Sequence, residues 1–297
     1  MSEIPRRNFL KTASAITAAA CASNFVFPTI SAQANSVDKV SMLIDTSKCT
    51  GCRSCMVACN KWNGLPLDVN RFHVTEEGRP RFSSTRWVDV VFNRYNGDGR
   101  STQENWLYTR FSCMHCTDAA CIKVCPVGAI EHSDLGTVDI NPRRCIGCNY
   151  CIANCTFNVI GFDRARNIAR KCTLCSDRLV QGMIPACAQA CLPGAITFGA
   201  RNDIKSIANA RVEELQRKGS PKADIYGLRE LDGLAMVYVL ELGHENSEAN
   251  YALPENPEVP QAANVWGAIF KPFRSILVAA LFFALWVNKG ESTVRKD

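Results

Sequence analysis

The sequence of 297 residues has no run of lysines and arginines and no long uninterrupted hydrophobic stretch. Its net charge of +6 is modest, so it lacks the concentrated positive charge typical of a protein that binds nucleic acid. Charged residues make up 21% and hydrophobic residues 47%, which excludes a disordered or fibrous chain. A chain of this length also buries a sufficient core without disulfides. The spacing of its 17 cysteines therefore has to explain why there are so many.

The N-terminal residues have the pattern of an export signal. Residues 6–11 read RRNFLK, an Ala-rich stretch covers residues 13–20, and Ala32-Gln33-Ala34 provides small residues for cleavage. The pattern resembles the twin-arginine class of bacterial signals, a route that carries folded proteins. We expect residues 1–34 to be a removed signal peptide, with a basic amphipathic helix as the alternative. Cys21 would leave with the signal and sixteen cysteines would remain.

The C-terminal residues have the composition of a short membrane-spanning segment. Residues 275–287 carry no charge, but a span needs about 20 residues, so it has to extend toward the N-terminus past two cations. Trp266 and Trp286 stand where interfacial aromatic residues are expected. We expect one anchor over residues 264–288 and a cytoplasmic tail over 289–297. The protein body would then lie at the periplasmic face of the bacterial inner membrane, and a buried or interfacial amphipathic helix is the alternative.

The sixteen remaining cysteines fall into four runs of four. The runs, numbered in chain order, are Cys49-x2-Cys52-x2-Cys55-x3-Cys59, Cys113-x2-Cys116-x4-Cys121-x3-Cys125, Cys145-x2-Cys148-x2-Cys151-x3-Cys155 and Cys172-x2-Cys175-x11-Cys187-x3-Cys191. The first and third match the bacterial ferredoxin pattern, and the others carry an insertion before the third cysteine. Three closely spaced thiolates can surround three corners of an iron–sulfur cube, while the fourth points away toward a partner run. The spacing therefore predicts [4Fe–4S] clusters.

Two structural alternatives for the cysteines are weaker. Zinc commonly takes two C-x2-C pairs in a tetrahedral site, and three successive cysteines at this spacing fit that geometry poorly. Disulfides between cysteines so close in sequence would form small strained rings, repeated in the same register.

Local patterns predict several regular elements around the runs. Residues 125–130 and 191–196 repeat a Pro/Gly turn that leads into a β-branched stretch, so a short strand should follow the second and the fourth run. The further predictions are a strand at 138–140, a helix over 204–218, a strand at 237–240, and a cysteine-free, β-rich insertion over 61–110 that docks on a partner.

The cysteine runs with their surroundings resemble a known family. It consists of the four-cluster, ferredoxin-like electron-transfer subunits of molybdenum/tungsten oxidoreductases and membrane-bound hydrogenases, and the likeness is greatest to the β subunit of membrane-bound respiratory formate dehydrogenase. The stretches that carry the resemblance are residues 49–63, 113–130, 145–163 and 171–199. It implies an α+β fold of two ferredoxin-like dicluster modules with a β-rich insertion, plus one C-terminal transmembrane helix.

The resemblance also implies how the cysteines are shared. The first set would be Cys49, Cys52, Cys55 and Cys191; the second Cys113, Cys116, Cys121 and Cys155; the third Cys145, Cys148, Cys151 and Cys125; the fourth Cys172, Cys175, Cys187 and Cys59. Each set would bind the iron of one of four [4Fe–4S] clusters. The first set would lie nearest the catalytic subunit and the fourth nearest the membrane.

The implied function is electron relay without catalytic residues. Electrons would pass from a periplasmic molybdenum/tungsten catalytic subunit of the formate dehydrogenase type to a membrane cytochrome b subunit that reacts with quinone. A signal peptide on this chain itself is more typical of the corresponding subunit of a [NiFe] hydrogenase, so that partner or another molybdoenzyme reductase is the alternative. The expected segments are the signal (1–34), the outer dicluster module (35–60 and 165–200), the insertion (61–110), the inner dicluster module (111–164), a docking extension (201–263), the anchor and the tail.

Six further residues lie beside the predicted ligands. Lys123, Arg143, Arg144, Arg170 and Lys171 could raise cluster potentials, with a solvated or subunit-facing charge as the alternative. His115 stands between Cys113 and Cys116, and we expect it to hydrogen-bond or pack locally, because thiolates already complete the set.

Overall fold

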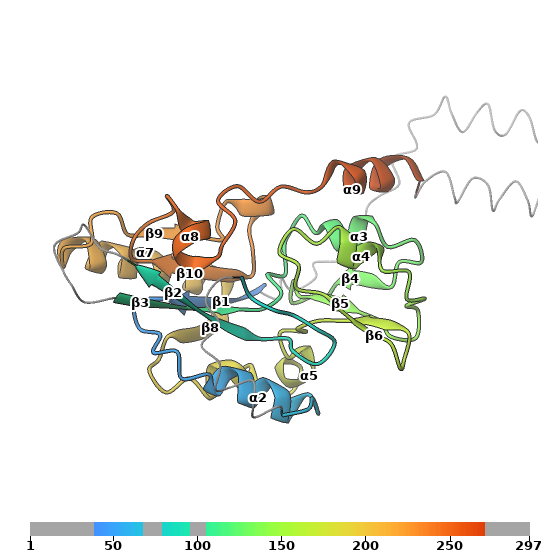
Figure 1. Cartoon of the computed structure of the whole chain (residues 1–297), viewed down its shortest axis with the longest axis horizontal. Coiled ribbons are helices and arrows are strands. Elements are labelled where there is room, and N and C mark those ends of the chain that lie inside the picture. The colour runs from blue at the N-terminus through green and yellow to red at the C-terminus, as the bar shows by residue number, and fades with distance from the viewer. Residues whose placement is uncertain (1–38, 68–78, 96–104, 271–297) are drawn as a thin grey trace, which may run out of the picture. The chain divides into compact units, whose positions relative to one another are not determined.

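The computed structural model describes residues 39–67, 79–95 and 105–270 (Figure 1). The predicted signal peptide (1–34), most of the predicted anchor (264–288) and the C-terminal tail lie outside the described residues. Within the described part of the chain, no helix is both long enough and apolar enough to cross a membrane.

The described residues form short helices and strands around one longer helix, α7. The strands are β1 (Val40–Asp45), β2 (Asp89–Tyr95), β3 (Asn105–Phe111), β4 (Ile130–His132), β5 (Val138–Ile140), β6 (Gly161–Asp163), β7 (Ile168–Arg170), β8 (Ile196–Ala200), β9 (Asp224–Tyr226) and β10 (Met236–Leu240). The helices are α2 (Ser54–Trp62), α3 (Ala120–Lys123), α4 (Tyr150–Ala153), α5 (Ser176–Leu179), α6 (Ala186–Gln189), α7 (Arg201–Arg217), η2 (Glu230–Asp232), α8 (Ser247–Tyr251), α9 (Gln261–Val265) and η3 (Trp266–Phe270).

A four-stranded sheet in the order β8–β1–β10–β9 supports the fold. β1 runs parallel to β10 and antiparallel to β8. Successive side chains of a strand point to opposite faces, so Leu43 packs on one face while Met42 and Ile44 join the cysteine-containing core on the other. Both faces are therefore buried around β1 and β10, which explains why the residues of β10, Met236–Leu240, are all hydrophobic and buried.

Helix α7 covers one face of this sheet. Its residues Ile204, Ala208, Val212 and Leu215 recur at the helical period and pack in one hydrophobic cluster with residues of β1, β9 and β10. The predicted helix over 204–218 is confirmed by α7.

The cysteine runs alternate with short strands. The predicted strands at 138–140 and 237–240 are confirmed as β5 and β10, and the strands expected after the second and fourth runs are β4 and β8. The hairpins β4–β5 and β6–β7 lie beside one another, away from the four-stranded sheet (Figure 1).

The predicted insertion contains a β-hairpin that packs on its own chain. β2 and β3 pair in antiparallel register and contact α8, and Asn93 Nδ2 donates to the Asn250 carbonyl at 2.9 Å. The expected docking extension (201–263) likewise supplies β9 and β10 to the central sheet and α7 to one of its faces, so these elements are part of the core. Residues 68–78 and 96–104 of the insertion lie outside the described residues.

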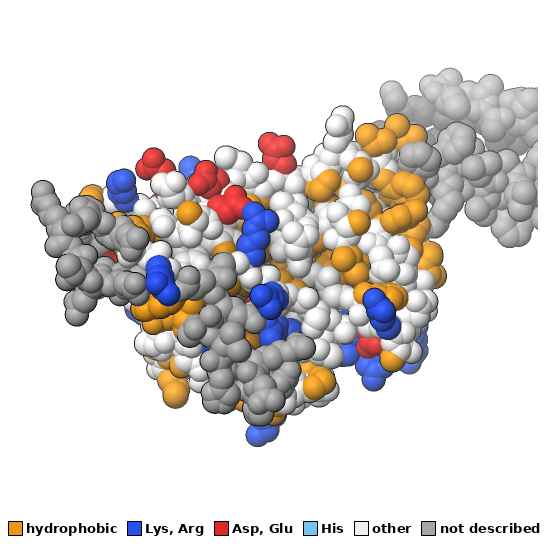
Figure 2. Space-filling view, in the orientation of Figure 1, with side chains coloured by type: hydrophobic (Ala, Val, Ile, Leu, Met, Phe, Trp, Pro, Cys, Tyr) orange, Lys and Arg blue, Asp and Glu red, His pale blue; other side chains and the backbone are white. Residues whose placement is uncertain are grey.

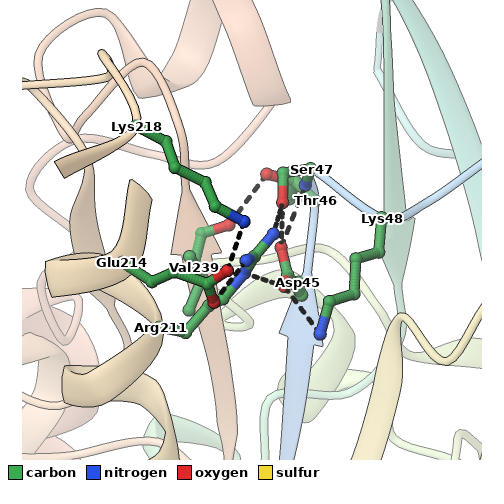
Figure 3. A network of polar contacts seen from close by, with 8 residues as sticks. All are labelled: Asp45, Thr46, Ser47, Lys48, Arg211, Glu214, Lys218 and Val239. Carbon is green, nitrogen blue, oxygen red and sulfur yellow. Dashed lines mark hydrogen bonds and ion pairs between the residues drawn. The ribbon is translucent and has the colours of Figure 1, made fainter. Parts of the chain in front are cut away.

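An ionic network holds the chain where it enters the first cysteine run (Figure 3). Asp45, the last residue of β1, is 2% exposed and accepts a hydrogen bond from Arg211 Nε of α7 at 2.7 Å. It also accepts from Ser47 Oγ at 2.5 Å, and Lys48 Nζ lies 3.4 Å away. Because the carboxylate is buried, water cannot solvate its charge, and the arginine offsets the lost solvation energy. The network thus connects α7 to the residues that precede Cys49.

Replacement of this arginine should destabilise the fold. Arg211→Met leaves the buried Asp45 carboxylate without its closest cationic partner, at an expected cost of about 2 kcal/mol. The thermal unfolding midpoint should fall by about 4–8 °C. Arg217→Met is the matched control, because Arg217 is exposed on the same helix and its Nε donates to the Glu213 carbonyl. Equal shifts in the two variants would contradict the role given to Asp45.

Candidate metal centres

Three of the four predicted cysteine sets each line one cavity. The second set, the third set and the fourth set each contribute all four of their cysteines to a separate cavity. The remaining lining is mostly apolar, as with Val138 and Ile160 beside the second set. Each cavity thus has four sulfur atoms around one space, which is the arrangement that an iron–sulfur cube requires.

The first set is closer to the surface. Cys49 has Cys191 and Cys52 among its electrostatic neighbours, and Cys55 in turn has Cys49 and Cys52. Cys52 is exposed. Slight burial raises the pKa of its thiol, but hydrogen bonds with Ser54 and Thr50 together outweigh burial, so the net pKa is lowered. The set therefore combines thiols from two segments that are far apart in sequence.

Left-handed backbone conformations bend the cysteine runs. Gly51 and Gly147 have φ angles of +68° and +70°, and a Cβ at Gly147 would lie 2.5 Å from the Asn167 carbonyl oxygen. Arg53 before α2 and Asn149 before α4 also have positive φ. The loop thus turns sharply before the helix begins, so the third cysteine of the run lies in the first turn of the helix.

Burial disfavours free thiolates in these sets. It raises the pKa of Cys55, Cys151 and Cys175 to about 12 and that of Cys113 to about 11. Without a metal partner these thiols would stay protonated at neutral pH. An iron–sulfur core supplies positive charge and favours soft anionic ligands, so the donor set fits a [4Fe–4S] cluster.

The four sets form a row in the order first, fourth, second, third. The neighbouring thiols that connect them are Cys55 with Cys187, Cys172 with Cys113, and Cys121 with Cys151. The expectation that the fourth set ends the row is therefore wrong. The reason is connectivity: β7, whose Ala169 lines the cavity of the third set, ends at Arg170, two residues before Cys172, so the chain enters the fourth set from that hairpin.

A buried arginine that sequence reasoning missed lies between the first and fourth sets. Arg110 of β3 is 1% exposed and lines the cavity of the fourth set. Its Nη2 donates to Cys187 Sγ at 3.4 Å and its Nη1 to Ser112 Oγ at 2.8 Å. Arg110 is the last residue of the predicted insertion. From sequence alone, one basic residue in a short strand cannot be distinguished from a charge that faces solvent.

Of the five cations predicted beside ligands, Lys171 is buried. Its Nζ donates to the carbonyl oxygens of Val138 and Cys172. The other four are exposed or paired with polar groups: Lys123 pairs with Asp118, Arg143 is exposed, Arg144 pairs with Glu131, and Arg170 pairs with Asp163. Burial lowers the pKa of Lys171, but the thiolates of Cys113 and Cys121 outweigh this and raise it. Lys171 is therefore the one of these five that acts in a low dielectric.

His115 is fully buried and has a local role, as predicted. Its Nδ1 accepts a hydrogen bond from the Val138 backbone N–H at 2.8 Å. Burial lowers its pKa well below the usual 6.5, and nearby Lys171 and Arg110 add to that effect. The imidazole therefore stays neutral and supports β5 beside the second set.

The disulfide alternative does not describe this structure. All sixteen cysteines of the runs, which lie among the described residues, are free thiols. In the same residues, no group of three or more His, Cys, Asp and Glu side chains is placed to hold a single metal ion.

Family models agree with the cysteine sets. Residues 104–201 match the model described as a 4Fe-4S dicluster domain, and residues 40–61 match a 4Fe-4S binding domain. Together with the thiol sets, these matches define a ferredoxin-like protein that carries [4Fe–4S] clusters and transfers electrons.

Within this class, the chain belongs to the family of formate dehydrogenase iron–sulfur subunits. It is 37% identical over 250 residues to the formate dehydrogenase-O iron–sulfur subunit of Escherichia coli, covering 83% of this chain and 81% of that protein. The nitrate-inducible formate dehydrogenase iron–sulfur subunit of Escherichia coli is 35% identical over 251 residues, covering 84% and 83%. The thiosulfate reductase electron transfer subunit PhsB of Salmonella typhi is 35% identical over 159 residues, covering 53% and 74%.

The neutral state of His115 makes stability depend on pH. Below about pH 6.5 the unfolded chain binds a proton that the folded chain excludes, so acidification from pH 7 to 5.5 should cost about 1 kcal/mol. His115→Asn should remove this pH-dependent loss of stability, because the asparagine side chain does not titrate. The fold should be kept, since Asn tolerates the left-handed backbone at this position and its side-chain oxygen can accept from the Val138 N–H.

The measurement is the thermal midpoint at the two pH values. The difference between them should shrink by about 2–4 °C in His115→Asn. His132→Asn, on an exposed residue, serves as the control and should keep the wild-type difference. An unchanged difference in His115→Asn would contradict a neutral buried imidazole.

Proposed function

We propose that the chain is an electron conduit with four [4Fe–4S] clusters, one in each cysteine set, and with no catalytic residues of its own. The observation that carries the proposal is the row of sets, in which a thiol of each set interacts electrostatically with a thiol of the next. A bound [4Fe–4S] cluster supplies one-electron transfer. The residues of the chain hold the thiolates, exclude water from most of them and fix the separation between sets.

Solvent exposure at the ends of the row fits entry and exit of electrons. Cys52 of the first set and Cys148 of the third set are exposed, whereas the other fourteen cysteines of the four runs are buried or half-buried. The two exposed thiols belong to the two terminal sets. A partner that docks over either end would approach a cluster closely, while the two inner sets contain no exposed cysteine.

We infer that the donor is a molybdenum/tungsten catalytic subunit of the formate dehydrogenase type at the first set. The family supports this partner, because the most extensive similarities described above are to iron–sulfur subunits of formate dehydrogenases. The acceptor would be a membrane cytochrome b subunit that passes electrons to quinone at the third set.

An exposed apolar surface beside the third set supports a membrane-side acceptor. Ile146, Tyr150, Val265 and Ile269 are all exposed, and Tyr150 packs edge to face on Trp266 with ring centroids 5.6 Å apart. Figure 2 shows hydrophobic side chains gathered on the part of the molecule where α4 and α9 lie. Such patches are typical of protein or membrane contacts.

The location proposed for the protein follows from its termini. The twin-arginine pattern would export the folded, cluster-loaded chain, and the apolar segment over 264–288 would anchor it as one transmembrane helix at the periplasmic face of the inner membrane. η3 forms the first part of that segment, and the contact of its Trp266 with Tyr150 places it on the side of the third set.

A second candidate keeps the relay and changes the donor. The signal peptide on this chain and the similarity to a thiosulfate reductase electron transfer subunit favour a [NiFe] hydrogenase or another molybdoenzyme reductase. The identity of the large subunit that co-purifies with the chain distinguishes these partners.

Interruption of the row should test both the relay and its order. In the purified complex, Cys116→Ala removes a ligand of the second set. Formate should then still reduce the clusters of the first and fourth sets, while the third stays oxidised and quinone reduction is lost. The measurement is electron paramagnetic resonance of rapidly frozen samples, with iron and acid-labile sulfide as a check of loading.

Cys148→Ala is the matched control at the end of the row. It should leave the first, fourth and second sets reducible by formate. Reduction of the third set in Cys116→Ala would contradict the order, and a complex without iron and sulfide would overturn the conduit itself. Reduction of the clusters by hydrogen but not by formate would contradict the formate dehydrogenase partner and support a hydrogenase partner.

A further inference from the structure

Arg110 is a buried cation without a carboxylate partner. Among the described residues, its leading electrostatic partners are three cysteines and Tyr238 and include no acidic side chain, and its Nε has no hydrogen-bond partner. Its remaining contacts are Cys187 Sγ, Ser112 Oγ and Met236 Sδ, the last at 3.7 Å. An isolated charge in such surroundings is costly unless an opposite charge is close.

The opposite charge has to come from the cysteine sets. The electrostatic neighbours of Arg110 are led by Cys187 and Cys172 of the fourth set, followed by Cys55 of the first. The guanidinium also lines the cavity of the fourth set and donates directly to one of its sulfur atoms. A hydrogen bond to sulfur and a nearby positive charge both favour the state with one more electron.

We propose that Arg110 is the fixed counter-charge of the fourth set and that it raises the reduction potential of the cluster held by Cys59, Cys172, Cys175 and Cys187. This inference rests on the proposed function, because it requires a cluster in that set. The effect on the first set is smaller, since no hydrogen bond joins Arg110 to a thiol of that set in the described structure.

The geometry explains why an arginine stands here. The planar guanidinium makes its contacts with Ser112 and Cys187 through two different nitrogen atoms, which a lysine ammonium cannot reproduce. Two other buried cations beside the fourth set make no hydrogen bond to sulfur in the described structure: Lys171 donates to backbone carbonyl oxygens, and Arg178 donates to the Ile184 carbonyl and to Gln189 Oε1. Arg110 therefore combines charge and sulfur contact.

The test is a potentiometric titration of the purified complex followed by electron paramagnetic resonance. The spectrum of Cys187→Ser assigns the signal of the fourth set. In Arg110→Met the equilibrium constant for reduction of that cluster should fall at least about tenfold, which for one electron corresponds to about 59 mV. In Arg110→Lys, which keeps the positive charge, the same equilibrium constant should fall less than about threefold.

Arg144→Gln is the control, because Arg144 adjoins a ligand in sequence but is exposed and paired with Glu131. This substitution should change the equilibrium constant for reduction of the fourth-set cluster by less than about threefold, because solvent screens an exposed charge. An unchanged potential in Arg110→Met with all clusters present would overturn the inference and leave the conduit intact.

Loss of the fourth-set cluster in the Arg110 variants would also test the inference. If Arg110→Met and Arg110→Gln lose the fourth signal while Arg110→Lys retains it, the counter-charge role is supported. Loss in all three variants would overturn it, because shape rather than charge would then be required. A wild-type complex without a fourth-set signal would instead contradict the proposed function.

Discussion

No cysteine run completes its own set, and this constraint organises the rest of the structure. The first and fourth runs exchange their last cysteines, as do the second and third. Strand pairing enforces both exchanges in the same way. β1 precedes the first run and pairs antiparallel with β8, which follows the fourth; β5 precedes the third run and pairs antiparallel with β4, which follows the second. The fold is thus built from two versions of one arrangement.

Electrostatics then limits what may surround the sets. Burial that keeps water away also raises the pKa of the thiols, so the protein interior disfavours the ligand form that metal binding needs. Arg110 and Lys171 are buried where adjacent sets meet, and they supply positive charge at these points. The chain combines dry surroundings with local cations because neither alone would hold several anionic centres close together.

Sequence reasoning succeeded where the signal is local and failed where it depends on distant contacts. The spacing of the runs, the strands beside them and the helix at 204–218 follow from patterns a few residues long, and the structure contains them. The order of the sets was predicted incorrectly, because it depends on how β7 leads into the fourth run. Arg110 was missed because its burial results from pairing of β3 with β2 and from packing on Tyr238, whose hydroxyl donates to the Arg110 carbonyl.

Exposure of Cys52 and Cys148 has a consequence for the life of the protein outside its complex. A sulfur ligand that solvent reaches is also one that oxidants reach, so damage to a free subunit would begin at its two ends. The partners proposed at these ends would shield the exposed sulfur atoms from oxidants in addition to exchanging electrons. In the export route proposed above, assembly of the folded complex before it reaches an oxidising compartment would protect these centres.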